Sequence, residues 1–291
     1  MARVHITDDD LVGIKDKVIL ITGGSSGIGR ATAQLCLDLG AKVVVGDMNP
    51  PKPEFTNNEN LKFLNVNVTE WESLRNMFTQ AMEWFGRIDH VFANAGIAPT
   101  PNFMEVKLNE DGQVEPPNLR VINVNFLAVI NTIHLAHAYM TKLAPENAGV
   151  GSIVLAASAS SFQTFSTGDY TIAKHGVLGM VRAFVEPFEG KVRINAIAPS
   201  WTDTGIMPGA LLQKINVSSQ TPDVVARSVA LLFADEKRHG DVLYSWDGNY
   251  REINNSEGGL LEGAAKLLDN AASEQSAILK IRAAFAKATK T

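Results

Sequence analysis

The sequence predicts an α/β protein with a single doubly wound parallel sheet of about seven strands, helices on both faces of the sheet and a C-terminal helical extension. Short, nearly continuous apolar runs alternate with longer segments of helical periodicity, as is typical of parallel strands buried on both faces. A glycine-rich turn joins the first strand to the first helix, as in folds of the Rossmann type. Strands that alternate with helices form right-handed crossovers, so we assign one domain to residues 1–248 and the extension to residues 249–291.

Seven segments carry the strand pattern. The expected strands are residues 17–23, 41–47, 61–68, 87–96, 151–158, 191–199 and 240–248. Five segments between them place apolar residues at helical spacing. The expected helices are residues 27–39, 69–86, 119–143, 169–188 and 221–235. Gly40 and Gly86 follow two of these helices, where a glycine commonly ends a helix, and Pro222 stands at the first position of the last one.

Two segments depart from this alternation. Residues 49–60 contain three prolines, so we expect a loop there in place of a full crossover helix. Residues 249–291 follow the last expected strand and carry the pattern of one or two amphipathic helices.

The composition argues against several classes of protein. The chain has 291 residues, of which 45% are hydrophobic and 20% charged, so we expect neither a disordered nor a fibrous protein. A net charge of −5 argues against a nucleic-acid partner, because phosphate binding relies on Lys and Arg. The single cysteine, Cys36, cannot form an internal disulfide, which suits a reducing compartment such as the cytoplasm. No uninterrupted apolar run reaches ~18 residues and the first residues lack the apolar core of a signal peptide, so we expect no membrane partner.

A glycine-rich turn follows the first expected strand. Thr-Gly-Gly-Ser-Ser-Gly-Ile-Gly spans residues 22–29 and leads into a helix. The missing Cβ atoms of Gly23, Gly27 and Gly29 let backbone N–H groups approach a pyrophosphate, and the N-terminus of the helix favours its negative charge. With a strand before it and a helix after it, the turn favours a dinucleotide site over an ordinary connection.

Asp47 ends the second expected strand. A carboxylate at this place can accept hydrogen bonds from both hydroxyls of the adenosine ribose, and it would repel a 2′-phosphate. Met48 and residues 24–26 supply no Arg or Lys to bind such a phosphate. The sequence therefore predicts NAD as the cofactor in preference to NADP, with a turn-capping role as the alternative for Asp47.

Tyr170 and Lys174 stand four residues apart in an expected helix, so their side chains share a face. A nearby ammonium lowers the pKa of a phenol from its free value near ~10, which makes tyrosine a usable general base near neutral pH. Ser158 ends the fifth expected strand, at the sheet edge where α/β proteins bind ligands. The alternatives are an unrelated surface pair and a serine that bonds its own backbone.

Taken together, these motifs resemble those of the short-chain dehydrogenase/reductase family over about residues 15–248. Residues 22–29 match the family's T-G-x-x-x-G-x-G turn, residues 94–96 match its N-A-G motif, and residues 195–199 with Thr204 resemble the segment after its sixth strand. The family's Asn-Ser-Tyr-Lys tetrad is matched by Asn125, Ser158, Tyr170 and Lys174. Asp47 and the long connection 98–118 are similar to 15-hydroxyprostaglandin-dehydrogenase-like members, particularly fungal ones with a C-terminal extension.

The resemblance implies a set of site residues. The implied catalytic residues are Asn125, Ser158, Tyr170 and Lys174. The implied cofactor-binding residues are Gly23, Ser25, Ser26, Gly27, Ile28, Gly29, Asp47, Met48, Asn67, Val68, Asn94, Ala95, Gly96, Tyr170, Lys174, Pro199, Thr202 and Thr204. The chain departs from the family where Asn67 replaces an aspartate beside the adenine, Ser200 a glycine and Thr202 a valine or isoleucine. The spacing from Ser158 to Tyr170 is one residue shorter than is common.

By resemblance, the reaction is a hydride transfer between NAD(H) and a secondary alcohol or its ketone. Tyr170 would take the hydroxyl proton, Lys174 would hold the nicotinamide ribose and lower the pKa of Tyr170, and Ser158 would stabilise the charge on the substrate oxygen. Asn125 would anchor a water of the proton relay. We expect no metal, because His134 and His137 have no cluster of Cys or carboxylates beside them in the sequence.

The candidate substrate walls are apolar. Residues 97–104, 159–168 and 201–219 carry aromatic and aliphatic side chains and few charges. The expected substrate contacts are Phe103, Ser158, Phe165, Tyr170, Trp201 and Met207. A hydrophobic small molecule, polycyclic or lipid-like, therefore suits the site better than a sugar phosphate, although these side chains could also belong to loop cores or to a subunit interface.

Other functions stay open on the sequence. A non-redox isomerase or cyclase could use the same tyrosine, an NADPH-dependent ketone reductase could use the same fold, and a cofactor-binding sensor would need no turnover. The resemblance further implies a homodimer or homotetramer through helices 119–143 and 169–188, and a place in secondary metabolism.

Overall fold

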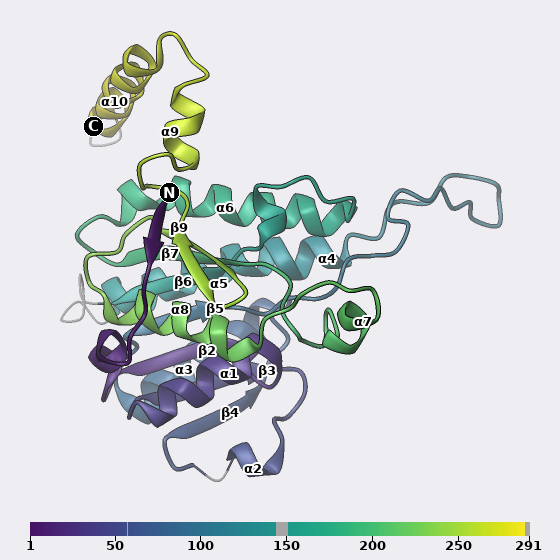
Figure 1. Cartoon of the computed structure of the whole chain (residues 1–291), viewed down its shortest axis with the longest axis vertical. Helices are drawn as coiled ribbons and strands as arrows, with labels where there is room; N and C mark the ends of the chain where they lie inside the picture. Colours follow the sequence, from purple (N-terminus) through teal and green to yellow (C-terminus); the bar gives the residue numbers. More distant parts are fainter. Residues whose placement is uncertain (57, 144–150, 289–291) are drawn as a thin grey trace.

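Nine strands form one sheet, in the order β1-β9-β8-β7-β6-β5-β2-β3-β4 (Figure 1). The computed structural model describes residues 1–56, 58–143 and 151–288. The parallel strands are β2 (Val18–Thr22), β3 (Lys42–Asp47), β4 (Leu61–Asn65), β5 (His90–Ala93), β6 (Ser152–Ala156), β7 (Arg193–Pro199) and β8 (Val242–Trp246). Each lies within one of the expected strands, so the prediction of a doubly wound parallel sheet is confirmed. The chain runs outward from β2 to β4 and then returns to β5 on the other side of β2, which opens a crevice at the carboxyl ends of β2 and β5.

The expected number of about seven strands was too low. β1 (Ala2–Val4) and β9 (Asn249–Glu252) extend the sheet beyond β8 with antiparallel pairing. β9 is polar and carries no apolar run, but Asp247 and Gly248 form a two-residue turn with φ of 48° and 74°. Asp-Gly is the sequence signal of such a hairpin, so β9 could have been found by its turn. β1 pairs with residues at the far end of the chain, which no local pattern reveals.

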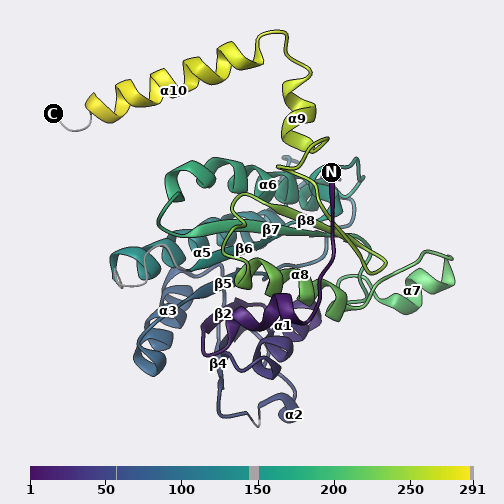
Figure 2. The ribbon, with the colours of Figure 1, turned by 60° about the vertical axis from the view of Figure 1, so that its left-hand side comes forward.

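Helices cover both faces of the sheet (Figure 2). They are α1 (Gly27–Asp38), α2 (Pro53–Thr56), α3 (Trp71–Phe85), α4 (Arg120–Ile122), α5 (Ala128–His137), α6 (Gly168–Phe188), α7 (Gly209–Lys214), α8 (Pro222–Ala234), α9 (Leu260–Ala265) and α10 (Ala271–Ala288). α1 and α8 pack together on one face with a 3₁₀ turn at Asp9–Ile14, and α3, α5 and α6 cover the other. One apolar core lies on each face. α2 is a single short turn in the segment expected to be a loop.

The expected helix 119–143 is continuous from Arg120 to Lys142 but changes its winding twice. π-helical segments at Asn123–Leu127 and Ala138–Lys142 flank α5. Among the described residues, this stretch alone is long and apolar enough to cross a membrane by length and composition, a test that a buried core helix also passes. It packs against β5 and β6, and the side chains of Ile133 and Ala136 are buried.

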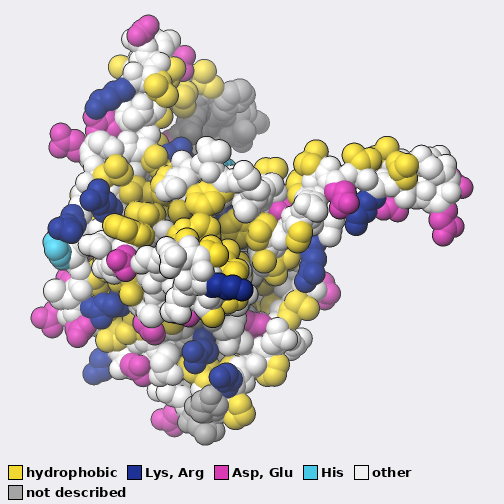
Figure 3. All heavy atoms as spheres, turned by 45° about the vertical axis from the view of Figure 1, so that its right-hand side comes forward, with side chains coloured by type: hydrophobic (Ala, Val, Ile, Leu, Met, Phe, Trp, Pro, Cys, Tyr) yellow, Lys and Arg dark blue, Asp and Glu magenta, His cyan; other side chains and the backbone are white. Residues whose placement is uncertain are grey.

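Two segments project from the body. α9 and α10 follow β9 and extend away from the sheet (Figures 1 and 2), so the expected helical extension is present from α9 onward, while residues 249–252 belong to the sheet. The connection between β5 and α4 forms the second projection, where Leu108 and Val114 pair in a short bridge. Figure 3 shows it as an arm that carries exposed apolar side chains.

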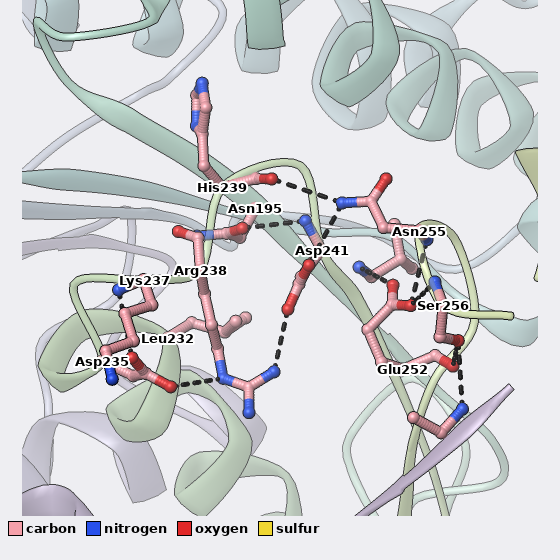
Figure 4. Close-up of polar contacts among 12 residues, drawn as sticks. Asn195, Leu232, Asp235, Lys237, Arg238, His239, Asp241, Glu252, Asn255 and Ser256 are labelled. Carbon is pink, nitrogen blue, oxygen red and sulfur yellow. Dashed lines mark hydrogen bonds and ion pairs between the residues drawn. The ribbon is translucent and has the colours of Figure 1, made fainter.

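Glu252 fixes the point where the extension leaves the sheet. Its carboxylate is 4% exposed and accepts hydrogen bonds from four backbone N–H groups, those of Val242, Asn254, Asn255 and Ser256 (Figure 4). Burial raises the pKa of Glu252, but these donors outweigh it and hold the pKa below the ordinary value of 4.5. In the adjacent turn, Arg238 lies between Asp235 and Asp241.

We expect Glu252→Gln to lower the free energy of unfolding by about 1–3 kcal/mol near neutral pH, because an amide N–H would then face backbone donors. The contribution of a carboxylate with a lowered pKa is present above its unfolded-state pKa and is lost as pH falls through its folded-state pKa. The difference between the two proteins should therefore shrink in acid, below about pH 4.5. Urea unfolding of Glu252→Gln and the wild type, near neutral pH and again below about pH 4.5, measures the difference in the free energy of unfolding. The exposed Glu257→Gln is the control. A difference that stayed constant with pH would contradict the assignment.

Candidate active site

A cleft of about 610 Å³ lies at the carboxyl ends of β2, β3 and β5. Twelve predicted cofactor residues line it: Gly23, Ser26, Gly27, Ile28, Asp47, Met48, Asn67, Val68, Asn94, Ala95, Gly96 and Thr204. The wall also contains residues that sequence reasoning missed, namely Gly46, Asn49, Val66, Thr69, Arg120 and Val124. Ile97, Gly205 and Ile206, which also line it, fall in segments expected to form the substrate walls. Arg120 is the one basic side chain among the lining residues. It comes from α4, far along the chain from the glycine turn, so no local motif could indicate it.

The conformation of the glycine turn excludes side chains at Gly23, Gly27 and Gly29. A Cβ on Gly29 would lie 2.2 Å from the carbonyl oxygen of Gly23, so Gly29 lies behind the cleft and packs α1 against the turn. Gly23 and Gly27 have φ of +68° and +52°, which L side chains rarely adopt. Ser26, the N-cap of α1, makes no side-chain capping bond, and the first turn carries no acidic residue. The first N–H groups of α1 are thus left for an anion, and the turn fits the diphosphate of a dinucleotide.

Asn94 ties this turn to β5. Its Nδ2 donates to the carbonyl oxygens of Thr22 and Gly23 at 3.1 and 2.9 Å. In return, the Thr22 hydroxyl accepts from the backbone N–H groups of Asn94 and Ala95. The N-A-G motif therefore holds the two strands together at the crevice and fixes the position of Gly23.

Asp47 is oriented by two backbone donors. Its Oδ2 accepts from the N–H of Ser25 at 3.1 Å and its Oδ1 accepts from the N–H of Asn49 at 2.9 Å. Ser25 thus stands behind the carboxylate, outside the lining residues. Each carboxylate oxygen keeps a lone pair that can accept a ribose hydroxyl.

Asn67 lines the cofactor cleft, and its predicted contact with the adenine stays a prediction. Its amide is engaged within its own turn, because Oδ1 accepts from the N–H and hydroxyl of Thr69 and Nδ2 donates to Glu70. The residue lines the cleft, but its side chain positions the start of α3.

A second cleft of about 190 Å³ adjoins the first. The two share the lining residues Ile28, Asn94, Gly96, Thr204 and Ile206, so they lie side by side. The predicted residues that line the smaller cleft are Ser158, Phe165, Tyr170, Lys174, Pro199, Trp201, Thr202 and Met207. Phe103 lies outside it and packs against Gly168 at the start of α6.

Lys174 and Tyr170 meet at the floor of this cleft. The Lys174 ammonium donates to the carbonyl of Ala156 at 2.6 Å and lies 5.5 Å from the centre of the Tyr170 ring. Burial lowers the pKa of Lys174 from 10.5 to about 8. Burial also raises the pKa of Tyr170, and the hydrogen bond from Ser158 opposes that rise. Three members of the predicted tetrad are therefore in contact or near contact.

Asn125, the fourth predicted member, is fully buried in the first π-helical segment and lines neither cleft. Its side chain bonds both backbone groups of Ile97, with Oδ1 accepting at 2.9 Å and Nδ2 donating at 3.0 Å. Asn125 thereby holds the segment after β5 against the helix. Its expected part in a proton relay stays a prediction.

Two positioning residues were missed by the sequence reasoning. Gln220 is buried and its Nε2 donates to Thr202 and Ser245, which holds the segment after β7. Asp169 is buried beside Tyr170, and its carboxylate accepts from the N–H groups of Tyr170 and Thr100. The sequence could not indicate this role, because an acidic residue in the first turn of a helix is common. The hydrogen bond from Thr100 shows that Asp169 joins α6 to the expected substrate wall.

Comparison with known proteins gives consistent matches. The family model for the short chain dehydrogenases matches residues 17–214. The chain is 43% identical over 272 residues to short-chain dehydrogenase/reductase ascJ of Acremonium egyptiacum, covering 92% of this chain and 90% of that protein. It is 28% identical to human 15-hydroxyprostaglandin dehydrogenase [NAD(+)], covering 67% of this chain and 71% of that protein. Among solved structures, levodione reductase superposes with a TM-score of 0.67 at 25% identity, covering 79% of this chain and 96% of that one.

We expect Asp169→Ala to reduce kcat/KM for an alcohol substrate by about 10- to 100-fold, because the Thr100 N–H loses its acceptor, the Tyr170 N–H keeps only the Thr167 carbonyl, and the wall and Tyr170 shift together. The dissociation constant for NADH should stay within about twofold, since Asp169 lies outside the cofactor cleft. Asp169→Asn keeps one acceptor oxygen, so its kcat/KM should lie between those of the wild type and Asp169→Ala. The exposed Asp223→Ala, in the first turn of α8, is the matched control. An equal loss of NADH binding would show a general structural defect instead.

Proposed function

The chain belongs to the short-chain dehydrogenase/reductase family, and from that premise we propose that it transfers a hydride between NAD(H) and an apolar secondary alcohol or its ketone. An oxidoreductase of the dehydrogenase/reductase kind follows from the family itself. The observation that carries the finer proposal is the shared wall of the two clefts, because Tyr170, Lys174 and Ser158 then line a cleft beside one suited to a dinucleotide.

This chain's own side chains supply the proton chemistry. Tyr170, as phenolate, takes the proton of the substrate hydroxyl, or returns it to the ketone oxygen in the reverse direction. The Lys174 ammonium stabilises the phenolate, and the Ser158 hydroxyl donates to the negative charge that develops on the substrate oxygen. When bound, the nicotinamide ring accepts or gives the hydride. The glycine turn, Asp47 and Thr204 would hold the cofactor.

Asp47 supports NAD over NADP. Two backbone donors fix the Asp47 carboxylate at the end of β3. A 2′-phosphate brought beside it would meet a negative charge. The relatives include a dehydrogenase whose name specifies NAD(+). Arg120, the basic residue among those that line the cleft, comes from α4, which packs against α6.

The smaller cleft supports an apolar substrate. Phe165 and Trp201 lie edge to face, with ring centres 5.7 Å apart and planes at 70°. Pro99 and Met207 complete an apolar wall that suits a ring or a hydrocarbon skeleton. A place in secondary metabolism is part of the same proposal, and the 43% identity with the short-chain dehydrogenase/reductase of Acremonium egyptiacum supports the family.

Tyr170→Phe should lower kcat for alcohol oxidation by about 10²- to 10⁴-fold, because the general base is removed while the ring still fills its place. NADH binding should be unchanged. Reduced nicotinamide, followed by its absorbance with a panel of apolar secondary alcohols, measures the rate. Tyr244→Phe, whose ring packs on Phe162 away from the clefts, should keep full activity. A product of unchanged mass would favour an isomerase or cyclase, and full activity of Tyr170→Phe would overturn the mechanism.

We expect NADH to bind about tenfold or more tightly than NADPH, and Asp47→Ser to bring the ratio close to one, because serine still accepts a hydrogen bond but carries no charge. Titration of protein fluorescence with each cofactor measures the ratio. Asp38→Ser, which removes the same charge from the exposed end of α1, should leave the ratio unchanged. Tighter binding of NADPH by the wild type would favour a ketone reductase.

A further inference from the structure

Three hydroxyl side chains meet in the wall of the smaller cleft. Thr171 Oγ1 lies 3.0 Å from Ser160 Oγ, 2.8 Å from Thr167 Oγ1 and 3.0 Å from the carbonyl oxygen of Phe165. Ser160 and Thr167 line the cleft, and Thr171 stands behind them. This trio comes from the turn after β6 and from the start of α6, so it flanks the two residues that bind the reacting oxygen.

The proton of each hydroxyl can be assigned by counting. A hydroxyl has one proton to donate and two lone pairs, whereas a carbonyl can only accept. The contact with the Phe165 carbonyl therefore uses the single proton of Thr171. At both hydroxyl–hydroxyl contacts Thr171 must accept, so Ser160 and Thr167 each donate their proton to it.

The wall is therefore left with lone pairs only. In the described part of the chain, no donor bonds to Ser160 Oγ or Thr167 Oγ1, and Ser160 is 4% exposed. While Ser160 and Thr167 keep their bonds to Thr171, any hydrogen bond between these hydroxyls and a substrate must be donated by the substrate. A carboxylate or a carbonyl placed here would meet only acceptors, whose lone pairs repel it.

The apolar wall and this polar wall form one unit. The Phe165 carbonyl that takes the proton of Thr171 belongs to the same residue whose ring packs edge to face on Trp201. The proton arrangement is thus fixed by the loop that also sets the width of the cleft.

We propose that the substrate carries a second polar group, an O–H or N–H donor on an otherwise apolar skeleton, that binds Ser160 and Thr167 while its secondary alcohol lies at Tyr170. A diol, a hydroxyketone or a phenolic alcohol has this chemistry, and a fatty acid or other carboxylate does not. The assignment of the reacting end rests on the function proposed above.

Binding of two matched ligands tests this without turnover. We would titrate the protein, in the presence of NADH, with trans-cyclohexane-1,4-diol and with trans-4-methoxycyclohexanol, and follow the ligands by NMR. The two share the ring and the reacting alcohol, and differ in whether the remote oxygen can donate. The diol should bind about tenfold more tightly, as for one added hydrogen bond.

Variants test whether Ser160, Thr167 and Thr171 cause the preference for the diol. In the double variant Ser160→Ala with Thr167→Val, the preference for the diol should fall to about one. Thr164→Val, an isosteric change at an exposed position of the same loop, should keep the preference. Thr171→Val frees the protons of Ser160 and Thr167, so the methoxy compound should gain affinity, which a merely structural role of Thr171 would not produce.

Equal or weaker binding of the diol, including no measurable binding, overturns the inference, as does a preference that survives in the double variant. An assay of NAD reduction with the same diol tests the proposed function separately. If the diol binds preferentially but no NADH forms, the proposed dehydrogenase activity is contradicted and the proposed donor-binding wall is supported. If NADH forms but the diol has no binding preference, the donor-binding wall is contradicted and the dehydrogenase activity is supported.

Discussion

The hydrogen bond from the buried Lys174 ammonium to the carbonyl of Ala156 ties the catalytic helix to the end of β6. An ammonium buried without an acceptor would destabilise the fold, so the side chain is held where that carbonyl lies. The Ser161 hydroxyl adds a second tie, by donating to the backbone carbonyl of Lys174. Because these bonds join α6 to the last residue of β6 and to the 3₁₀ turn that follows Ser158, they also fix Tyr170 relative to Ser158. The same burial that lowers the pKa of Lys174 brings its charge beside the phenol.

Short polar links hold the remaining walls of the crevice. Asn94 joins the glycine turn to β5, Asn125 holds the segment after β5, and Gln220 holds the segment after β7. Each of these amides bonds backbone atoms or a neighbouring hydroxyl at the carboxyl edge of the sheet. Backbone positions are therefore set independently of the apolar side chains that face the substrate.

The two ends of the smaller cleft have opposite hydrogen-bonding character. At the inner end lie Ser158 and Tyr170, which in the function we propose bind the reacting oxygen. At the wall, Thr171 holds the protons of Ser160 and Thr167, and only acceptors remain. Under this proposal, a substrate is oriented by which of its oxygens can donate, and its apolar skeleton bridges the two ends.

Local patterns were sufficient for much of the fold. Each parallel strand lies within a segment expected from its apolar run, because a strand buried on both faces leaves few places for polar residues. Gly23 and Gly29 were recognisable because a close backbone approach excludes a Cβ, and Tyr170 with Lys174 because helical spacing puts them on one face. β9 was missed because its residues are polar, although the Asp-Gly turn before it was a usable signal.

The tertiary structure alone decided the partners of residues far apart in sequence. That Asp169 reaches Thr100, that Arg120 faces the cofactor cleft, and that Phe103 packs on Gly168 and not in the substrate cleft all depend on how loops cross the sheet edge. The direction of the protons at Thr171 likewise depends on a carbonyl brought near by the turn at Phe165. Sequence patterns record the period and burial of single elements, whereas hydrogen-bond partners between elements are set by packing.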